Sequence, residues 1–169
     1  MSVTPTHYDI KLKPERVSSI ICNANELLLS ASVVTDSTTI SPVTSLHKEE
    51  ETVTLALGQQ LSPGLATVTY QFTGILNDKM SGFYRSMYMK DGQEQFAAVT
   101  QFEATDARQA FPCWDEPAVK ATFAMTIVGP KDRVILSNMP EIESKDDPED
   151  ITCKVHLPSG HCGRGVSFY

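Results

Sequence analysis

The sequence has little positive charge for its size. Its 14 Lys and Arg residues stand against 21 Asp and Glu residues, which gives a net charge of −7 and a pI near 5.0. Nucleic acids and anionic membranes both attract basic surfaces, so we expect neither among its partners. The acidity gathers in two runs, HKEEE at 47–51 and EIESKDDPED at 141–150, which we expect to be solvated loops.

Cysteines and long apolar runs are also scarce. Four cysteines in 169 residues are too few for a disulfide framework. No apolar run approaches the ~20 residues that a membrane-spanning helix needs. The opening residues, MSVTPTHYDIKLKP, do not place a basic region before an apolar one, as a secretory signal would. These absences predict reduced thiols and a cytoplasmic location.

The common catalytic and metal-binding motifs are missing. None of the four histidines belongs to an H-E-x-x-H pair, and no serine stands in G-x-S-x-G. The segment CKVHLPSGHC brings together residue types that suit zinc, namely Cys153, His156, His161 and Cys162. Because His161 and Cys162 are adjacent, closing one tetrahedron around a metal would be awkward. We therefore favour a chance arrangement and expect no metal in this chain.

Period-two alternation of apolar and polar residues is abundant. It is clearest where Ala66, Val68, Tyr70 and Phe72 alternate with polar residues, and it recurs at 8–12, 27–33, 53–57, 96–103, 121–128, 133–136 and 151–157. Such runs predict strands with one wet face and one dry face. Only a short helical turn is expected, near 106–111. The pattern predicts an all-β fold, either an antiparallel sandwich or a saddle-shaped open barrel, with an irregular C-terminal tail.

The densest chemistry lies in TQFEATDARQAFPCWDEP, the 18 residues from Thr100 to Pro117. If 96–103 is a strand, Gln101 and Glu103 share a face, because side chains two apart point the same way. An amide and a carboxylate presented together at a strand end predict a binding lip. The alternative, that Glu103 only pairs with Arg108, is equally compatible with the residue types.

The rest of this segment is interpreted as structural. An Asp and an Arg two residues apart are able to pair across a turn, and the prolines fix φ and end strand pairing. The tryptophan supplies a large apolar anchor, and the last two acidic side chains are able to cap turns. The structural set is Asp106, Arg108, Pro112, Trp114, Asp115, Glu116 and Pro117.

The longer segment TQFEATDARQAFPCWDEPAVKATF resembles the signature of the N-terminal domain of the M1 family of zinc aminopeptidases. HYDIKLKP, GILNDKMSGFYRSMY and PKDRVILSNMP agree with it, so the resemblance spreads over about 6–140. It implies a β-saddle that packs over a thermolysin-like catalytic domain and forms one wall of the active site. It also implies a domain at 1–157 with an apparent deletion between 14 and 20, followed by a divergent tail at 158–169.

The resemblance further implies roles for the two lip residues. Glu103 would bind the free α-amino group of a peptide, and Gln101 would line the pocket for the first side chain. Zinc belongs to the complete enzyme, and the catalytic domain would be a partner in cis. The zinc motif and the G-x-M-E-N motif of the family are absent here, so the isolated chain is predicted to be inactive. The alternatives are a truncated non-catalytic interaction module and a non-functional fragment.

Overall fold

The computed structural model describes residues 8–11, 16–36, 38–116, 118–119, 121–130, 133–138, 140–141, 143–146 and 152–161; of β1 (Tyr8–Lys11) and β12 (Thr152–His161) it describes the backbone. The described residues form strands, turns and one short 3₁₀ helix, and every strand pairing among them is antiparallel. This confirms the predicted all-β antiparallel fold. None of the helical structure described here is long and apolar enough to cross a membrane.

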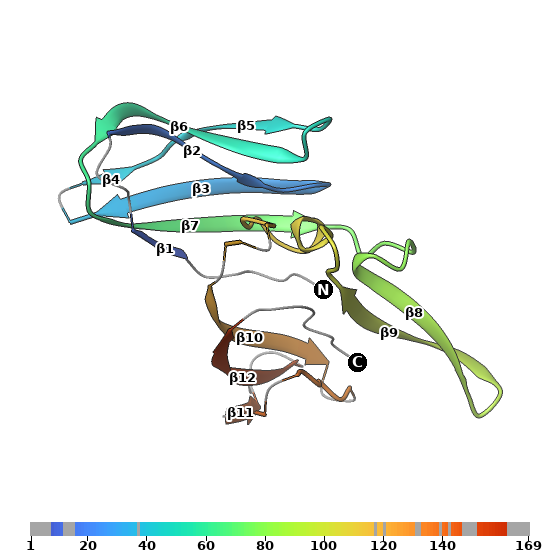
Figure 1. The fold of residues 1–169 in the computed structure, drawn as a ribbon. Coiled ribbons are helices and arrows are strands. Elements are labelled where there is room, and N and C mark those ends of the chain that lie inside the picture. The colour runs from blue at the N-terminus through green and yellow to red at the C-terminus, as the bar shows by residue number, and fades with distance from the viewer. Residues whose placement is uncertain are drawn as a thin grey trace. The chain divides into compact units, whose positions relative to one another are not determined.

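The chain divides into two compact units, of which one contains 2–74 and 111–114. This unit is a sandwich of two sheets, which Figure 1 shows as separate layers. One sheet has the order β1-β7-β3-β4, with β7 at Leu65–Gly74, β3 at Leu27–Thr35 and β4 at Thr39–Ile40. The other has the order β2-β6-β5, with β2 at Val17–Asn23, β6 at Thr52–Leu61 and β5 at Val43–His47.

The core of the sandwich follows the alternation read from the sequence. On β7 every second side chain is buried, namely Ala66, Val68, Tyr70 and Phe72. The facing strand β6 buries Val53, Leu55 and Leu57 in the same rhythm. These side chains belong to one hydrophobic cluster that both sheets supply. Burial of this apolar surface, at roughly 25 cal/mol per Å², is what holds the two sheets together.

One polar contact crosses this core. The Sγ atom of Cys22 on β2 lies 3.2 Å from the hydroxyl oxygen of Tyr70 on β7, and both side chains are buried. Burial raises the pKa of the Cys22 thiol to about 11, and the hydrogen bond with Tyr70 opposes that rise only in part. The thiol is therefore protonated at neutral pH, and thiolate chemistry is suppressed at this position.

This raised pKa predicts a pH dependence of stability. The folded pKa lies above the ordinary value of 9.0, so the stabilisation is complete below pH 9 and is lost as the pH rises towards 11. The thiol's share of the loss is about 2–3 kcal/mol in the free energy of unfolding. Urea titrations between pH 7 and 11 should show a flatter profile for Cys22→Ala than for the unchanged chain. Parallel profiles would contradict this.

The second unit contains 75–110 and 115–169. It holds a two-stranded ribbon of β8 (Gly82–Lys90) and β9 (Gln93–Gln101), and the 3₁₀ helix η1 (Ala107–Gln109). It also holds a three-stranded sheet of order β10-β12-β11, with β10 at Thr122–Pro130 and β11 at Glu143–Asp146. The short helical turn expected near 106–111 is confirmed by η1.

Two expectations from the sequence are wrong in this unit. Residues 133–136 form no strand, because Val134 and Leu136 are exposed and Arg133 instead closes a turn onto the Pro130 carbonyl at 3.0 Å. The acidic run 141–150 was expected to be a loop, but β11 lies within it and pairs with β12. β11 is an edge strand with charged side chains, so its sequence lacks the apolar–polar alternation that predicts a strand. β12 continues to His161, past the expected boundary at 157, and the tail at 162–169 lies outside the described residues.

The β8–β9 ribbon ends in a tight turn at its far end. Asp91 and Gly92 both have positive φ, 53° and 76°, as the two central residues of a twist-matched hairpin turn require. In the register, Met87 lies opposite Phe96 and Met89 opposite Glu94, so Met87, Met89 and Phe96 share one face. All three are exposed, at 54%, 61% and 46%. The ribbon therefore exposes three large apolar side chains on one face, which also carries Glu94.

Candidate functional site

The two lip residues lie at the open end of the β8–β9 ribbon. β9 ends at Gln101, which pairs with Gly82, the first residue of β8. The strand thus begins before the expected 96–103 and ends two residues earlier, because β8 offers no partner beyond Gly82. Phe102 is buried, whereas Gln101 and Glu103 on either side of it are exposed. The structure therefore places both polar side chains at the surface, with Glu103 in a turn rather than on a strand.

The residues 102–109, called here the Glu103 turn, are closed by backbone hydrogen bonds. The N–H of Asp106 donates to the carbonyl of Phe102 at 3.0 Å, which closes the chain around Glu103. The N–H of Gln109 then donates to the carbonyl of Asp106 at 3.1 Å and begins η1. The Glu103–Ala104 peptide bond is cis. Glu103 is therefore flanked on both sides by residues that take part in the same closed turn.

Side chains fasten the end of the Glu103 turn to the start of β8. Gln109 donates its Nε2–H to Oδ1 of Asp106 at 2.7 Å, and Ser81 donates its hydroxyl to Oε1 of Gln109 at 3.4 Å. Gly82 has φ +66°, and a Cβ at this position would lie 2.5 Å from the Cβ of Gln109. Only a glycine leaves room for the turn to pack this closely.

The predicted structural residues divide between two sets of contacts. Arg108 forms an ion pair with Asp115, whose Oδ2 accepts from Nε at 3.1 Å and from the Arg108 backbone N–H at 3.2 Å. Both side chains are only 13% and 11% exposed. Asp106, expected to pair with Arg108, instead precedes η1 and accepts from Gln109. The Asp115 carboxylate thus accepts from a backbone N–H of η1.

The Pro–Cys–Trp part of the segment is structural in the sandwich unit. Pro112 is fully buried, and Trp114 packs against the hydrophobic cluster. Cys113 pairs with Asn23 through two backbone hydrogen bonds of 2.7 and 3.0 Å. Glu116 is exposed, and its carbonyl accepts from the N–H of Val119 at 3.0 Å. Pro117 lies outside the described residues.

The loop before β8 is ordered by Asn77 and an exposed ion pair. Asn77 donates its amide to the carbonyls of Ser81 at 3.0 Å and Phe83 at 3.2 Å. Arg85 binds Asp78 through two hydrogen bonds, which lower the pKa of that carboxyl. The Arg85 guanidinium also lies 5.2 Å from the centre of the Phe96 ring. These contacts hold the start of β8, against which the Glu103 turn is fastened.

Thr100, next to Gln101, carries a buried hydroxyl that has no hydrogen-bond partner among the described residues. An unpaired buried hydroxyl costs roughly 1–3 kcal/mol. We therefore expect Thr100→Val to raise the free energy of unfolding by about 1 kcal/mol. Thr73→Val, at an exposed site on β7, is the control and should change it by less than about 0.5 kcal/mol. Urea titration measures both, and destabilisation by Thr100→Val would show that the hydroxyl is paired in solution.

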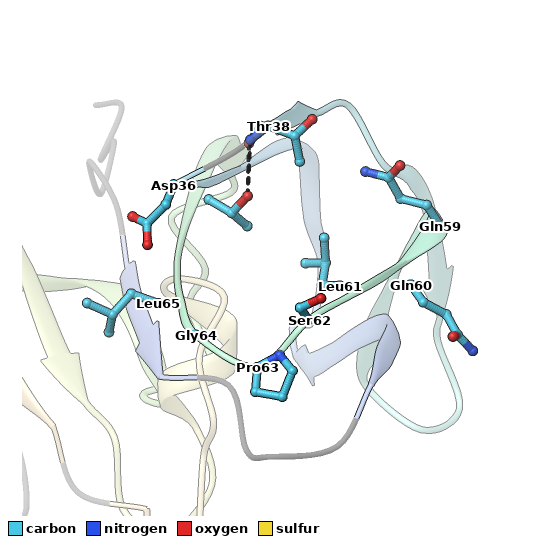
Figure 2. Close-up of a pocket in the computed structure, with 10 residues that line it drawn as sticks. Asp36, Thr38, Gln59, Gln60, Leu61, Ser62, Pro63, Gly64 and Leu65 are labelled. Carbon is cyan, nitrogen blue, oxygen red and sulfur yellow. Dashed lines mark hydrogen bonds between the residues drawn. The ribbon is translucent and has the colours of Figure 1, made fainter.

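A shallow pocket of about 360 Å³ lies elsewhere, in the sandwich unit. Figure 2 shows that the turn between β6 and β7 lines it, together with Asp36 and Thr38. The N–H of Thr38 donates to the hydroxyl of Thr35 at 3.2 Å. Gln101 and Glu103 do not line this pocket, and its mostly exposed polar lining shows no convergence of groups on one point.

The open end of the ribbon thus carries two exposed polar residues, Gln101 at the end of β9 and Glu103 in the turn that follows. Such a pair is suited to accepting hydrogen bonds from a cationic group, which a carboxylate binds more strongly than a neutral acceptor does. The part of the chain that the structure describes contains no cluster of three or more His, Cys, Asp or Glu side chains that could hold a metal ion. The side chains of Cys153, His156 and His161 are not described, and Cys162 lies outside the described residues.

Comparison with known proteins places this geometry in a family. The model of the Peptidase M1 N-terminal domain matches residues 4–157. The chain belongs to the M1 peptidase family. The resemblance seen in the sequence is thereby confirmed, and M1 membership implies zinc in the complete enzymes.

Nothing in the sequence alone indicated Gly82 and Gln109, whose close contact is visible only in the folded structure.

The M1 relatives are much longer than this chain. Aminopeptidase M1 of Arabidopsis thaliana is 40% identical over 165 residues, which cover 83% of this chain and 19% of the relative. Aminopeptidase 2 of Candida albicans is 35% identical, with 85% and 17% covered. Puromycin-sensitive aminopeptidase of Caenorhabditis elegans, a member that the segment also resembles, is 38% identical, with 80% and 17% covered. The chain therefore spans about a fifth of the length of these relatives.

Proposed function

We propose that this chain is the substrate-anchoring N-terminal domain of an M1 aminopeptidase, in which Glu103 binds the α-ammonium group of a peptide. The observation that carries the proposal is that Glu103 is exposed, two residues after the exposed Gln101, in a turn that backbone hydrogen bonds close and that Gln109 links to Ser81. Gln101 lines the pocket for the first side chain. The domain comprises 1–157 and continues with β12 to His161, and the divergent tail follows at 162–169.

The chemistry of an exopeptidase explains why a carboxylate is needed here. The amino end of a peptide differs from an internal residue in having a free ammonium group. A carboxylate in a fixed position binds that group at a set distance from the scissile bond. A charge-assisted hydrogen bond contributes about 1.5–3 kcal/mol. Alignment of the first peptide bond adds an orientation effect that is able to exceed the binding itself.

Hydrolysis belongs to another part of the complete protein. In this proposal the catalytic domain lies in cis, binds the zinc and carries out the reaction, while this domain binds and orients the peptide's amino end. The support is that the relatives named aminopeptidases continue for about four-fifths of their length beyond the matched region. The cytoplasmic location stays a prediction.

Ligand binding to the 169-residue chain tests the anchoring role. We expect L-leucinamide, which has a free amine, to shift the backbone amide NMR signals of 102–106 in a saturable manner. N-acetyl-L-leucinamide, which has the same side chain but no charge, should not. Glu103→Gln should weaken the binding of L-leucinamide at least tenfold, a change of about 1.4 kcal/mol. Equal responses to the two ligands would refute the role of the ammonium group.

A second candidate function, a non-catalytic interaction module, is favoured by the exposed apolar side chains of the ribbon. Met87, Met89 and Phe96 are exposed together, and adjacent exposed apolar side chains are a feature of interaction surfaces. The occupant in this case is an M1 catalytic region lacking its own N-terminal domain. Co-purification that Met87→Ser combined with Phe96→Ser abolishes would support the module. Association that is unchanged by these substitutions, or absent altogether, would exclude it.

A further inference from the structure

We propose that Gln109 is a positioning residue for Glu103, which it holds in place through Asp106 and the first residues of β8. The inference rests on the proposed function, since it concerns how the ammonium-binding carboxylate is oriented. It adds a residue that touches no substrate and whose importance comes from the contacts within the Glu103 turn.

The Glu103 turn begins and ends at one rung of the ribbon. It leaves β9 at Gln101, which is paired with Gly82. It returns with Gln109, whose Cβ lies 2.5 Å from where a Cβ of residue 82 would stand. The loop that carries Glu103 is therefore closed on itself over Gly82, and Gln109 is the residue that makes the closing contact.

Gln109 is linked to the backbone on both sides of Glu103 through Asp106. Its Nε2–H donates to Oδ1 of Asp106 at 2.7 Å, while the Asp106 N–H donates to the Phe102 carbonyl at 3.0 Å. Phe102 and Asp106 are the two residues whose backbone hydrogen bond encloses Glu103 within the Glu103 turn. Fixing Asp106 thus fixes the path of the backbone from which the Glu103 side chain projects.

The amide of Gln109 has both functions that this place requires. Its nitrogen donates to a carboxylate, and its oxygen accepts from the Ser81 hydroxyl at 3.4 Å. A glutamate of the same size keeps the acceptor but loses the donor, and it places a second negative charge beside Asp106. An asparagine at position 106 keeps the acceptor that Gln109 needs. These two near-isosteric changes separate the hydrogen bond from the size of the side chains.

The test measures dissociation constants of L-leucinamide for the full chain by NMR. Gln109→Ala and Gln109→Glu should raise the dissociation constant three- to tenfold, whereas Asp106→Asn should leave it within twofold. Gln93→Ala, an exposed glutamine on the same ribbon, is the matched control and should have no effect. N-acetyl-L-leucinamide should cause no saturable shift in any of these variants, so the measured changes concern the free amine.

A double-mutant cycle provides the decisive comparison. If Gln109 acts through Asp106, the double variant Asp106→Ala/Gln109→Ala should bind L-leucinamide no more weakly than the weaker of the two single variants. Additive effects would overturn the proposal. So would an unchanged dissociation constant in Gln109→Glu while Glu103→Gln weakens binding, and that outcome would leave the anchoring role intact.

Discussion

Replacing Glu103 by alanine should lower kcat/KM on free-amine substrates by well over tenfold in a complete M1 aminopeptidase whose N-terminal domain is residues 4–157 of this chain. Tenfold corresponds to about 1.4 kcal/mol, and the charge-assisted hydrogen bond alone contributes about 1.5–3 kcal/mol. The loss of alignment adds to this, so kcat should fall as well as KM rise. Hydrolysis of an aminoacyl 4-nitroanilide measures both constants.

The matched control for this substitution is Glu94→Ala. Glu94 is also an exposed glutamate of the β9 region, but it lies towards the far end of the ribbon, opposite Met89. Glu94→Ala should change kcat/KM by less than twofold, because Glu94 lies near the opposite end of β9 from the Glu103 turn. Normal turnover by Glu103→Ala, or equal losses in both variants, would remove the anchoring role from Glu103.

Gly82→Ala should lower the free energy of unfolding by about 2–5 kcal/mol. The added Cβ would lie 2.5 Å from the Cβ of Gln109 and 3.2 Å from the carbonyl oxygen of Asp106. Overpacking of this kind costs about 1–3 kcal/mol, and a non-glycine residue at positive φ costs about 1–2 kcal/mol more. Urea titration, followed by the amide signals of 102–109, measures the loss.

Gly92→Ala isolates the steric part of this effect. Gly92 has φ +76°, close to the +66° of Gly82, but a Cβ there would meet no atom within 4 Å. The two variants thus share the backbone cost, and only Gly82→Ala adds the clash. Equal destabilisation by both would show that the Glu103 turn does not pack against β8 as described.

The sandwich could be predicted from the sequence because its strands are wet on one face and dry on the other. On β7, the alternation of Ala66, Val68 and Tyr70 with threonines named the buried side chains correctly. β2 and β8 were not recognised: VSSIICN and GFYRSMYMK do not alternate in a regular manner, and β8 is exposed over most of its length. β8 is held mainly by pairing with β9, so hydrophobic alternation does not mark it. β2 does bury Ile20 and Cys22, but the exposed Ile21 between them interrupts the alternation.

The candidate site was only partly predictable. Residue types indicated that Gln101 and Glu103 belong together at a lip, and both are exposed there. The bond between Gln109 and Asp106, and the close approach of Gln109 to Gly82, join residues whose pairing depends on how the turn folds back. The residue spacings typical of strands and helices do not predict where a turn folds back onto a strand. These residues could therefore be identified only from the structure.

The most direct test of ammonium binding by Glu103 is a crystal structure of the complete M1 aminopeptidase that contains this N-terminal domain, with a free-amine substrate analogue bound. We expect an oxygen of the Glu103 carboxylate within about 2.7–3.2 Å of the ligand's ammonium nitrogen. Gln101 should lie beside the ligand's first side chain. An ammonium group held by other residues, with the Glu103 carboxylate directed away from the ligand, would contradict it.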